Sequence, residues 1–349
     1  MSDSNKITGR PALGQGLLAA TLMAASVCGS AHAGVLQADI LKTKVGALTQ
    51  RFNGKVGFCA RDGAQLICSK GERAFPMQSV MKLLVAVAVM DRVDQGQLGL
   101  NDNVVVRSAD GSVCVQPILD RVPPSGAYRT SIDALLTSMV VDSDCAAADL
   151  LLARLGGPEA VRALLARKDL TGLRLDRDER HLQTEIDGLE WRSAFVEPAV
   201  LKRAEAAVPG ARRQAAFDAY LKDPRDTASP AAMTLLLQRL SDGRLLSAAS
   251  TDHLLSVMTQ TRTGSARLKA GLRGGWRLAH KTGTGGAYGG VFSAVNDVGV
   301  LTAPDGGKVM VAAFVSKTRV SVAGQERLIA ALARAVVDSY TPQAEAIRP

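Results

Sequence analysis

The sequence is poor in the residues that most often carry metal or catalytic-triad chemistry. Its 349 residues include only four histidines and five cysteines, and they form no Cys-x-x-Cys pair and no zinc-ligand spacing. A Gly-x-Ser-x-Gly element is also absent, and the histidines beyond the N-terminal segment are only His181, His253 and His280. These absences argue against a metal-dependent hydrolase and against a Ser-His-Asp triad. We expect no metal and no cofactor.

A concentrated basic run and a membrane-spanning segment are also lacking. The formal net charge is +9, but the basic residues are dispersed, so nucleic acid is not an expected partner. Lys6 and Arg10 precede a short apolar stretch over residues 13–27, and Ala31-His32-Ala33 is a small-residue cleavage site. The stretch is too short for an anchor. We predict a signal peptide over residues 1–33, a periplasmic location, no membrane anchor and a monomer.

Hydrophobic periodicity separates the two ends of the mature chain from its middle. Near both ends it predicts strands next to amphipathic helices, and in the middle it predicts mainly helices. The helices are expected at 36–52, 80–93, 132–139 with Ser131 as its N-cap, 146–155, 158–167, 230–240, 247–259 and 328–337, and the strands at 56–60, 65–69, 276–281, 288–295 and 309–315.

This order predicts an α/β fold with two lobes. Residues 34–75 and 262–349 are expected to form an antiparallel sheet flanked by the N- and C-terminal helices. Residues 76–261 are expected to form an inserted all-helical lobe. A long charged excursion, about residues 176–230, lies within it and contains some helix. A ligand site is expected between the lobes, where such sites are common.

Four cysteines follow the predicted cleavage site. Cys59 and Cys68 flank a hairpin turn, and a loop from Asp62 to Gln65 would place them opposite each other. In an oxidising compartment they could form a cross-strand disulfide. Two buried thiols are the equally open alternative.

Three short motifs point to acyl-transfer chemistry. Ser79 and Lys82 are three positions apart, so on a helix the hydroxyl and a proton acceptor share one face. Ser143 offers a second hydroxyl that could pass on a proton. Lys281-Thr282-Gly283 ends a predicted strand, where a cation, hydroxyls and an open backbone can align a carboxylate substrate.

Each motif alone has a plainer interpretation. Ser-x-x-Lys is common by chance, the Ser-Asp pair at 143–144 is equally a helix N-cap, and Lys281-Thr282-Gly283 is equally a hairpin turn with a surface lysine. Their order and flanks together are more specific. They match the Ser-x-x-Lys, Ser-Asp-Asn and Lys-Thr-Gly set of the class A β-lactamases and penicillin-binding proteins. The chain resembles the class A serine β-lactamases from about Phe52 to its last helix.

Further local matches support this resemblance. Residues 176–183 resemble the family's omega-loop segment, and residues 225–230 resemble the end of that loop. Thr263-Gly264-Ser265-Ala266-Arg267 lies upstream of the Lys-Thr-Gly strand, as expected. The resemblance implies that Arg177 and Asp226 pair to close the loop.

The resemblance also implies roles for the site residues in hydrolysis of a small-molecule β-lactam. Ser79 would be acylated, Lys82 and Glu179 would share general-base duty, and Glu179 would activate the deacylating water. The backbone N–H groups of Ser79 and Thr284 would form the oxyanion hole. Ser143 would protonate the ring nitrogen. The substrate carboxylate would be held by Lys281, Thr282, Gly283, Thr284 and Arg267.

The chain departs from the family pattern at several positions. Cys145 replaces the asparagine that contacts the substrate's side-chain amide, and a thiol is a weaker hydrogen-bonding group. Gln183 replaces the asparagine that helps Glu179 hold water. Forty-one residues separate Gln183 from Arg225, where the family has a handful. We call residues 184–224 the insertion, and expect them to form an extra flap beside the site. Gln78 and Gly285 exclude the disulfide found there in some carbapenem-hydrolysing relatives.

Two alternatives remain open at this point. One is a D,D-peptidase-like penicillin-binding protein that is acylated but deacylates slowly. The other is a non-catalytic envelope binding module on the same fold. Glu179 favours hydrolysis, because deacylation needs a carboxylate that holds a water against the ester.

Overall fold

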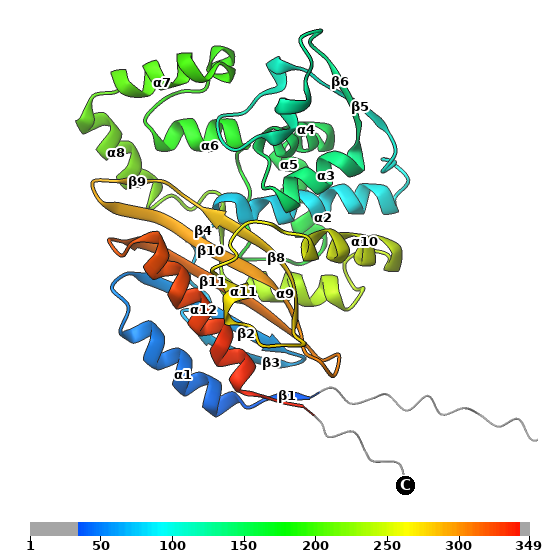
Figure 1. The fold of residues 1–349 in the computed structure, drawn as a ribbon, viewed down its shortest axis with the longest axis vertical. Coiled ribbons are helices and arrows are strands. Elements are labelled where there is room, and N and C mark those ends of the chain that lie inside the picture. The colour runs from blue at the N-terminus through cyan, green and yellow to red at the C-terminus, as the bar shows by residue number, and fades with distance from the viewer. Residues whose placement is uncertain (1–33, 343–349) are drawn as a thin grey trace, which may run out of the picture. The chain divides into compact units, whose positions relative to one another are not determined.

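The computed structural model describes residues 34–342, and the predicted signal peptide lies outside them. An antiparallel sheet with strand order β3-β2-β11-β10-β8 forms the centre, and β9 pairs with the end of β10 (Figure 1). The strands are β2 (Lys55–Asp62), β3 (Gln65–Ser69), β8 (Arg277–Thr284), β9 (Ala287–Tyr288), β10 (Val291–Thr302) and β11 (Lys308–Thr318). The predicted α/β class and antiparallel sheet are confirmed.

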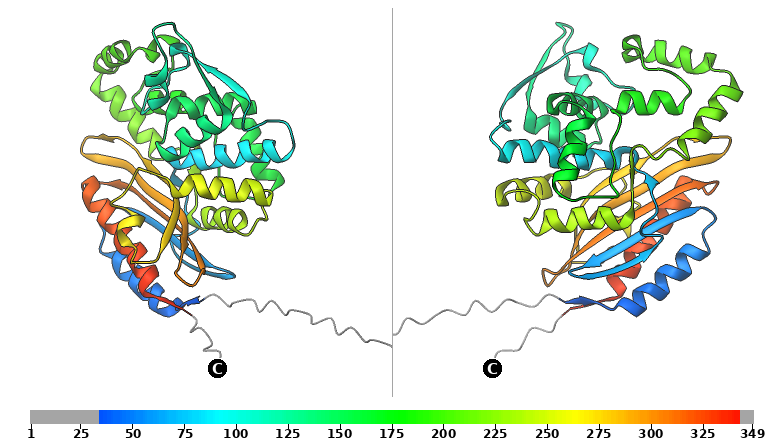
Figure 2. Two further views of the ribbon diagram at one scale, coloured as in Figure 1. Left: turned by 45° about the vertical axis from the view of Figure 1, so that its right-hand side comes forward. Right: turned by 180° about the vertical axis from the view of Figure 1, so that it is seen from behind.

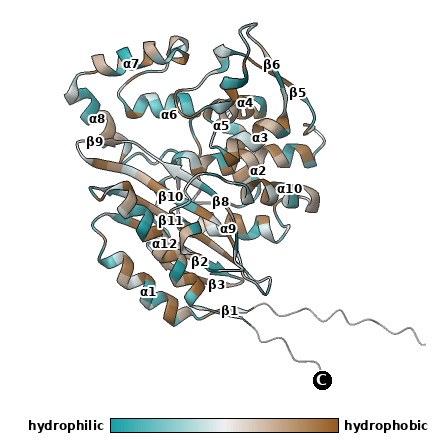
Figure 3. Cartoon of the chain, in the orientation of Figure 1, coloured by the Kyte–Doolittle hydropathy of each residue, from teal (hydrophilic) through white to brown (hydrophobic). Residues whose placement is uncertain are grey.

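Strand β11 shows why the sheet is buried on both faces. Val309, Val311, Ala313 and Val315 pack into one hydrophobic cluster, whereas Met310, Ala312 and Phe314 pack into another. Successive side chains of a strand point to opposite faces, so an unbroken apolar run needs cover on both sides. Figure 3 shows this apolar character along the central strands.

Helices supply that cover. On one face, α1 (Ala38–Gln50) and α12 (Val322–Asp338) pack against each other and against the strands, with α11 (Leu268–Gly271) beside α12. On the other face, α9 (Pro230–Ser241) packs on β2, β10 and β11, and α10 (Ala248–Thr259) packs on β8 (Figure 2). The two ends of the described part of the chain meet where β1 (Val35–Leu36) pairs with β12 (Tyr340–Thr341).

Beyond α9 and α10 lies a helical layer around α2 (Met81–Asp94), which is buried along most of its length. It contacts α3 (Ile132–Val141), α4 (Cys145–Leu155) and α5 (Pro158–Arg167). Ser131 caps α3 as predicted, by accepting a hydrogen bond from the Ala134 N–H. The remaining short elements here are η2 (Ser108–Asp110), η3 (Pro117–Arg121), β5 (Asn103–Val106) and β6 (Tyr128–Ser131). The lobe boundaries at 75/76 and 261/262 stay a prediction.

The predicted hairpin is confirmed, and of the two alternatives left open for its cysteines the structure has the disulfide. Cys59 lies opposite Cys68 in the β2–β3 ladder, and the two cysteines are bonded. The ladder extends to the Asp62–Gln65 pair, so the turn is two residues, Gly63-Ala64, and is shorter than expected. The predicted helix at 328–337 was also too short, because α12 begins at Val322.

The insertion folds into helices. It begins within the last turn of α6 (Glu179–Ile186) and contains η4 (Ser193–Val196), α7 (Pro198–Ala207) and α8 (Gly210–Tyr220). After it, β7 (Thr227–Ala228) pairs with β4 (Phe75–Pro76), directly before the segment that carries Ser79. The two ends of the excursion are therefore fixed close to the candidate nucleophile, and α8 descends toward β9 (Figure 1).

Among the described residues, no helix is both long enough and apolar enough to cross a membrane.

Candidate active site

Ser79 and Lys82 lie together where the buried helix begins. Ser79 is in the single turn η1 (Gln78–Val80), which leads directly into α2. The Lys82 Nζ lies 3.0 Å from the Ser79 Oγ. Ser79 is half-buried, whereas Lys82 is fully buried. The hydroxyl is thus accessible while the amine beside it is shielded from water.

Glu179 completes a tight group with these two residues. Its Oε1 lies 2.9 Å from the Lys82 Nζ and 3.4 Å from the Ser79 Oγ, although the three residues are far apart in sequence. Burial opposes ionisation of Glu179, but the Lys82 ammonium, the Gln183 amide and Lys281 outweigh it and hold the pKa of the carboxyl below its usual value. An ionised carboxylate at this point can accept a proton.

Ser143 joins the two lysines of the site. Its Oγ accepts a hydrogen bond from the Lys281 Nζ at 2.9 Å and lies 3.5 Å from the Lys82 Nζ. Its backbone is left-handed, with φ of 62°, and the next residue, Asp144, caps α4. Both interpretations of the Ser-Asp pair therefore fit: Asp144 is an N-cap, and Ser143 is a hydroxyl within the site. We call Ser79, Lys82, Ser143, Glu179 and Lys281 the candidate cluster.

Lys281 is fully buried near the end of β8. Burial, followed by repulsion from Lys82, sets its pKa well below the ordinary lysine value. The side chain is therefore easier to deprotonate than a surface lysine, and it can exchange a proton with the Ser143 hydroxyl.

The rest of the Lys-Thr-Gly strand faces the nucleophile turn. A Cβ on Gly283 would lie 2.3 Å from the Met77 carbonyl oxygen, so glycine is required for the close approach of these two backbones. The Asn296 amide on β10 donates to the same carbonyl at 3.0 Å. The Thr282 hydroxyl is hydrogen-bonded to Thr263 at 2.6 Å.

Arg267 lies next to this strand, and its guanidinium is held by hydrogen bonds within the protein. Its guanidinium is buried and donates to the Thr284 Oγ1 at 2.7 Å and to the carbonyls of Gly283 and Asn296. It also pairs with Glu326 at 3.2 Å. Direct contact with a substrate carboxylate stays a prediction. The interaction present in the structure is the one that holds the exposed Thr284 side chain.

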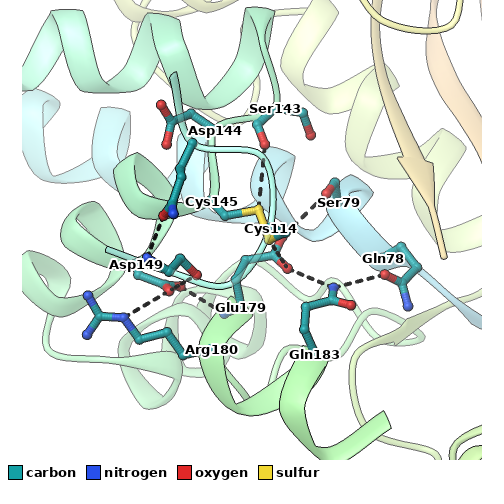
Figure 4. Close-up of a disulfide and its surroundings, with 12 residues drawn as sticks. Gln78, Ser79, Cys114, Ser143, Asp144, Cys145, Asp149, Glu179, Arg180 and Gln183 are labelled. Atoms are coloured by element: carbon teal, nitrogen blue, oxygen red, sulfur yellow. Dashed lines mark hydrogen bonds and ion pairs between the residues drawn. A yellow bond between two sulfur atoms is a disulfide. The ribbon is translucent and has the colours of Figure 1, made fainter. Parts of the chain in front are cut away.

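Cys145 is bonded to Cys114, which corrects the expectation of a free thiol. The sulfurs sit inside the candidate cluster (Figure 4). The Cys145 Sγ lies 3.3 Å from the Lys82 Nζ, and the Cys114 Sγ lies 3.8 Å from the Glu179 Oε2. A disulfide sulfur has no proton to donate, so it offers Lys82 only a weak acceptor.

This disulfide was not predicted, although the number of cysteines in the sequence indicates it. Once Cys59 and Cys68 are paired, Cys114 and Cys145 are the two cysteines left after the predicted cleavage site. Together with Glu179 they also bring three potential metal-ligand atoms within 4.8 Å of one another. The sulfurs are consumed by the bond between them, so this group is not a metal site in the oxidised protein.

Asp149 is a second residue that sequence reasoning missed. It is only 5 % exposed and accepts hydrogen bonds from the Glu179 N–H and the Ser112 hydroxyl, both at 2.8 Å. Burial, together with repulsion from Asp178 and Glu179, raises the pKa of Asp149 to about 7. It fixes the start of α6, and therefore the backbone of Glu179.

Gln183 lies one helical turn after Glu179 and bonds to it. Its Nε2 donates to the Glu179 Oε2 at 3.0 Å and to the Gln78 Oε1 at 3.0 Å. The amide that the sequence analysis assigned to this position therefore reaches the carboxylate despite its extra methylene.

The predicted pair between Arg177 and Asp226 is confirmed, with an Nε–Oδ2 distance of 2.6 Å. The histidines lie elsewhere, as expected. His280 is buried against Asp297 at 2.8 Å, while His181 and His253 pair with carboxylates nearer the surface. None contacts Ser79, so the base next to the candidate nucleophile is a lysine or a carboxylate.

Over most of its length the chain is similar to known β-lactamases. The model of the "Beta-lactamase enzyme family" matches residues 40–340. β-Lactamase VEB-1 of Pseudomonas aeruginosa is 27% identical over 308 residues, covering 87% of this chain and 91% of its own. β-Lactamase L2 of Stenotrophomonas maltophilia is 30% identical over 270 residues, covering 76% and 74%.

Solved structures agree with these relatives. An ancestral class A β-lactamase is 32% identical, with a TM-score of 0.69 over 85% of this chain and 99% of its own. A β-lactamase from Chitinophaga pinensis is 27% identical, with a TM-score of 0.69 over 85% and 98%.

Proposed function

Because the chain belongs to the class A serine β-lactamase family, we propose that it hydrolyses β-lactam antibiotics through an acyl-enzyme on Ser79. One observation carries the proposal beyond family membership. The Glu179 carboxylate lies 3.4 Å from the Ser79 hydroxyl and is hydrogen-bonded to the Gln183 amide. A carboxylate at that place can serve the hydrolytic step, which acylation alone does not need.

In the acylation step, the Ser79 Oγ attacks the carbonyl carbon of the four-membered ring. Its proton passes to Lys82 or Glu179, both within 3.4 Å. The negative charge on the carbonyl oxygen is stabilised by the backbone N–H groups of Ser79 and Thr284. When the ring C–N bond breaks, the nitrogen takes a proton from the Ser143 hydroxyl. The proton taken from Ser79 restores the Ser143 hydroxyl through Lys82, 3.5 Å away, so Glu179 is ionised again before water attacks.

In the deacylation step, Glu179 removes a proton from water, and the resulting hydroxide attacks the Ser79 ester. The ester C–O bond breaks, and Ser79 recovers its proton from the Lys82–Glu179 pair. One water is consumed, and the product is a ring-opened acid. Gln183 holds the Glu179 oxygen that is not bonded to Lys82, which leaves that carboxylate in one orientation.

The substrate carboxylate would bind along the end of β8. Lys281, Thr282 and Thr284 supply a charge and two hydroxyls there, and Gly283 keeps the strand close to the nucleophile turn. Arg267 would act through the Thr284 hydroxyl, to which it donates. The proposal further includes export to the periplasm, cleavage of the signal peptide near Ala33 and a monomeric enzyme without a cofactor.

Turnover of a chromogenic cephalosporin tests this function directly. We expect the parent to turn it over, and Ser79→Ala to lose both turnover and the covalent adduct seen by intact mass. A parent that forms a permanent adduct would be a D,D-peptidase-like protein instead. A parent with neither turnover nor adduct would be a binding module.

A further inference from the structure

The side chain of Tyr220 brings the insertion next to the candidate cluster. Tyr220 is the last residue of α8 and only 5 % exposed. Its hydroxyl oxygen accepts a hydrogen bond from the Nε2 of Gln78, the residue directly before Ser79. A segment without a counterpart in the family pattern thus reaches the neighbour of the nucleophile.

Gln78 is fixed on both sides. It is 1 % exposed and has a left-handed backbone with φ of 48°. While its Nε2 donates to Tyr220, its Oε1 accepts from the Gln183 Nε2 at 3.0 Å. The same Gln183 nitrogen donates to the Glu179 Oε2 at 3.0 Å. These side chains form a hydrogen-bond chain, and Figure 4 shows its part from Gln78 through Gln183 to Glu179.

The direction of each hydrogen bond in this chain of side chains follows from its first member, Glu179. An ionised carboxylate only accepts hydrogen bonds, so Gln183 must present its NH2 group to Glu179. The second hydrogen of that group is then available to the Gln78 Oε1, and the Gln78 NH2 group must find an acceptor on its other side. The Tyr220 hydroxyl is that acceptor. Without it, a buried amide N–H would lose its partner, and the orientation of Gln78 would no longer be fixed.

Helix α8 is held at both of its ends, so Tyr220 is not on a loose segment. Near its C-terminus, Asp223 pairs with Arg177 at 3.2 Å and with Arg225 at 2.8 Å. At its N-terminus, the Tyr288 hydroxyl on β9 donates to the Gly210 carbonyl at 3.1 Å. The Tyr288 ring also packs against Phe217, with ring centroids 6.2 Å apart.

We infer that Tyr220 is a positioning residue for deacylation. Through Gln78 and Gln183 it keeps the Glu179 carboxylate oriented toward the hydrolytic water, so the insertion forms part of the deacylation machinery. This inference rests on the proposed function, because it presupposes an acyl-enzyme that Glu179 helps to hydrolyse. It predicts that Tyr220 influences the second chemical step more than the first, because Lys82, which neither glutamine contacts, can take the Ser79 proton during acylation.

Tyr220→Phe tests the inference, because it removes one oxygen and keeps the ring. We expect the deacylation rate to fall about five- to ten-fold, the effect of losing one buried hydrogen bond. The acyl-enzyme should accumulate in intact-mass spectra, and kcat and KM should fall together. The ratio kcat/KM, which reports acylation, should stay within about two-fold of the parent.

Tyr288→Phe is the matched control. It removes a tyrosine hydroxyl that binds the same insertion, at Gly210, without touching the Gln78 amide, so its kinetics should equal those of the parent. Gln183→Ala gives a second test. Once the hydrogen-bond chain is interrupted at Gln183, adding Tyr220→Phe should slow deacylation no further.

The outcomes separate this inference from the proposed function. Tyr220→Phe with unchanged deacylation, or with equal losses in kcat and kcat/KM, would overturn the positioning role while parental turnover stands. Full additivity with Gln183→Ala would also overturn it. A parent that does not turn over any β-lactam would overturn both.

Discussion

At the scale of single residues, the site combines buried charges with accessible hydroxyls. Lys82, Glu179 and Lys281 are fully buried, while Ser79 and Ser143 remain partly exposed. Burying charge is costly unless the charges are paired. Lys82 is paired with the Glu179 carboxylate at 2.9 Å, whereas Lys281 donates to the neutral Ser143 hydroxyl at 2.9 Å and has a pKa well below the ordinary lysine value. The arrangement protects the proton-transfer groups from water and leaves the hydroxyls within reach of a substrate.

Asp149 is a buried carboxyl whose ionisation is disfavoured, and it gives a pH prediction. Its pKa is raised to about 7 in the folded protein, against about 4 when unfolded. The folded chain therefore binds the proton more tightly between those values. The stability contributed by this side chain is present at low pH and is lost as the pH rises through that window.

Asp149→Asn removes this titration and keeps an acceptor for the Glu179 N–H. We expect its free energy of unfolding, relative to the parent, to increase between pH 5 and pH 8 by on the order of 1–3 kcal/mol. Urea denaturation at the two pH values measures this change. A difference that does not vary with pH would contradict the raised pKa.

At the scale of elements, the insertion is closed by a network of ion pairs. Arg177 contacts Asp223 and Asp226, and Arg225 contacts Glu185 and Asp223. The Arg177–Asp226 pair is the buried member. Removing one partner of a buried pair leaves the other charge uncompensated, which is more costly than losing a surface pair.

We therefore expect Asp226→Asn to lower the free energy of unfolding by about 3–5 kcal/mol. The matched control is Asp242→Asn, which breaks the exposed Arg244–Asp242 pair and should cost less than about 1 kcal/mol. Chemical denaturation measures both, and limited proteolysis should cut the Asp226 variant faster within residues 187–223. Equal costs for the two variants would show that the pair does not fix the insertion.

The two disulfides join elements over different lengths of chain. The Cys59–Cys68 bond spans 9 residues within one hairpin. The Cys114–Cys145 bond spans 31 residues and ties the segment after η2 to the start of α4. In the chain-entropy view, the longer loop stabilises the fold more, because it restricts the unfolded chain more strongly.

Replacing both cysteines of each bond by alanine compares the two. We expect a loss of about 3–4 kcal/mol for the Cys114–Cys145 pair and about 2–3 kcal/mol for the Cys59–Cys68 pair. Urea denaturation of the oxidised proteins provides the comparison. A larger loss for the hairpin pair would show that loop length does not control the difference.

At the scale of the whole molecule, the sequence predicts what depends on local spacing. Ser79 and Lys82 meet because three positions on a helix share a face, and Cys59 meets Cys68 because a short turn sets the register. The caps at Ser131 and Asp144 follow from residue type. These features need little information beyond the neighbouring residues.

Contacts that depend on the path of the insertion could not be predicted in the same way. Tyr220 lies 142 positions from Gln78, and only the packing of α8 brings the two together. Asp149 has no motif around it, and its role appears only when α6 docks against α4. The Cys114 bond was within reach by elimination, but its position among Lys82 and Glu179 required the fold.

The proposed hydrolysis depends on Glu179, the group expected to release the acyl-enzyme from Ser79. Intact-mass spectrometry of the parent and of Glu179→Ala, sampled over time after mixing with a penicillin, tests this most directly. We predict a transient adduct on the parent and a long-lived adduct on Glu179→Ala, equal in mass to the intact β-lactam. A Glu179→Ala variant that clears the adduct as fast as the parent would contradict the role of Glu179 in deacylation.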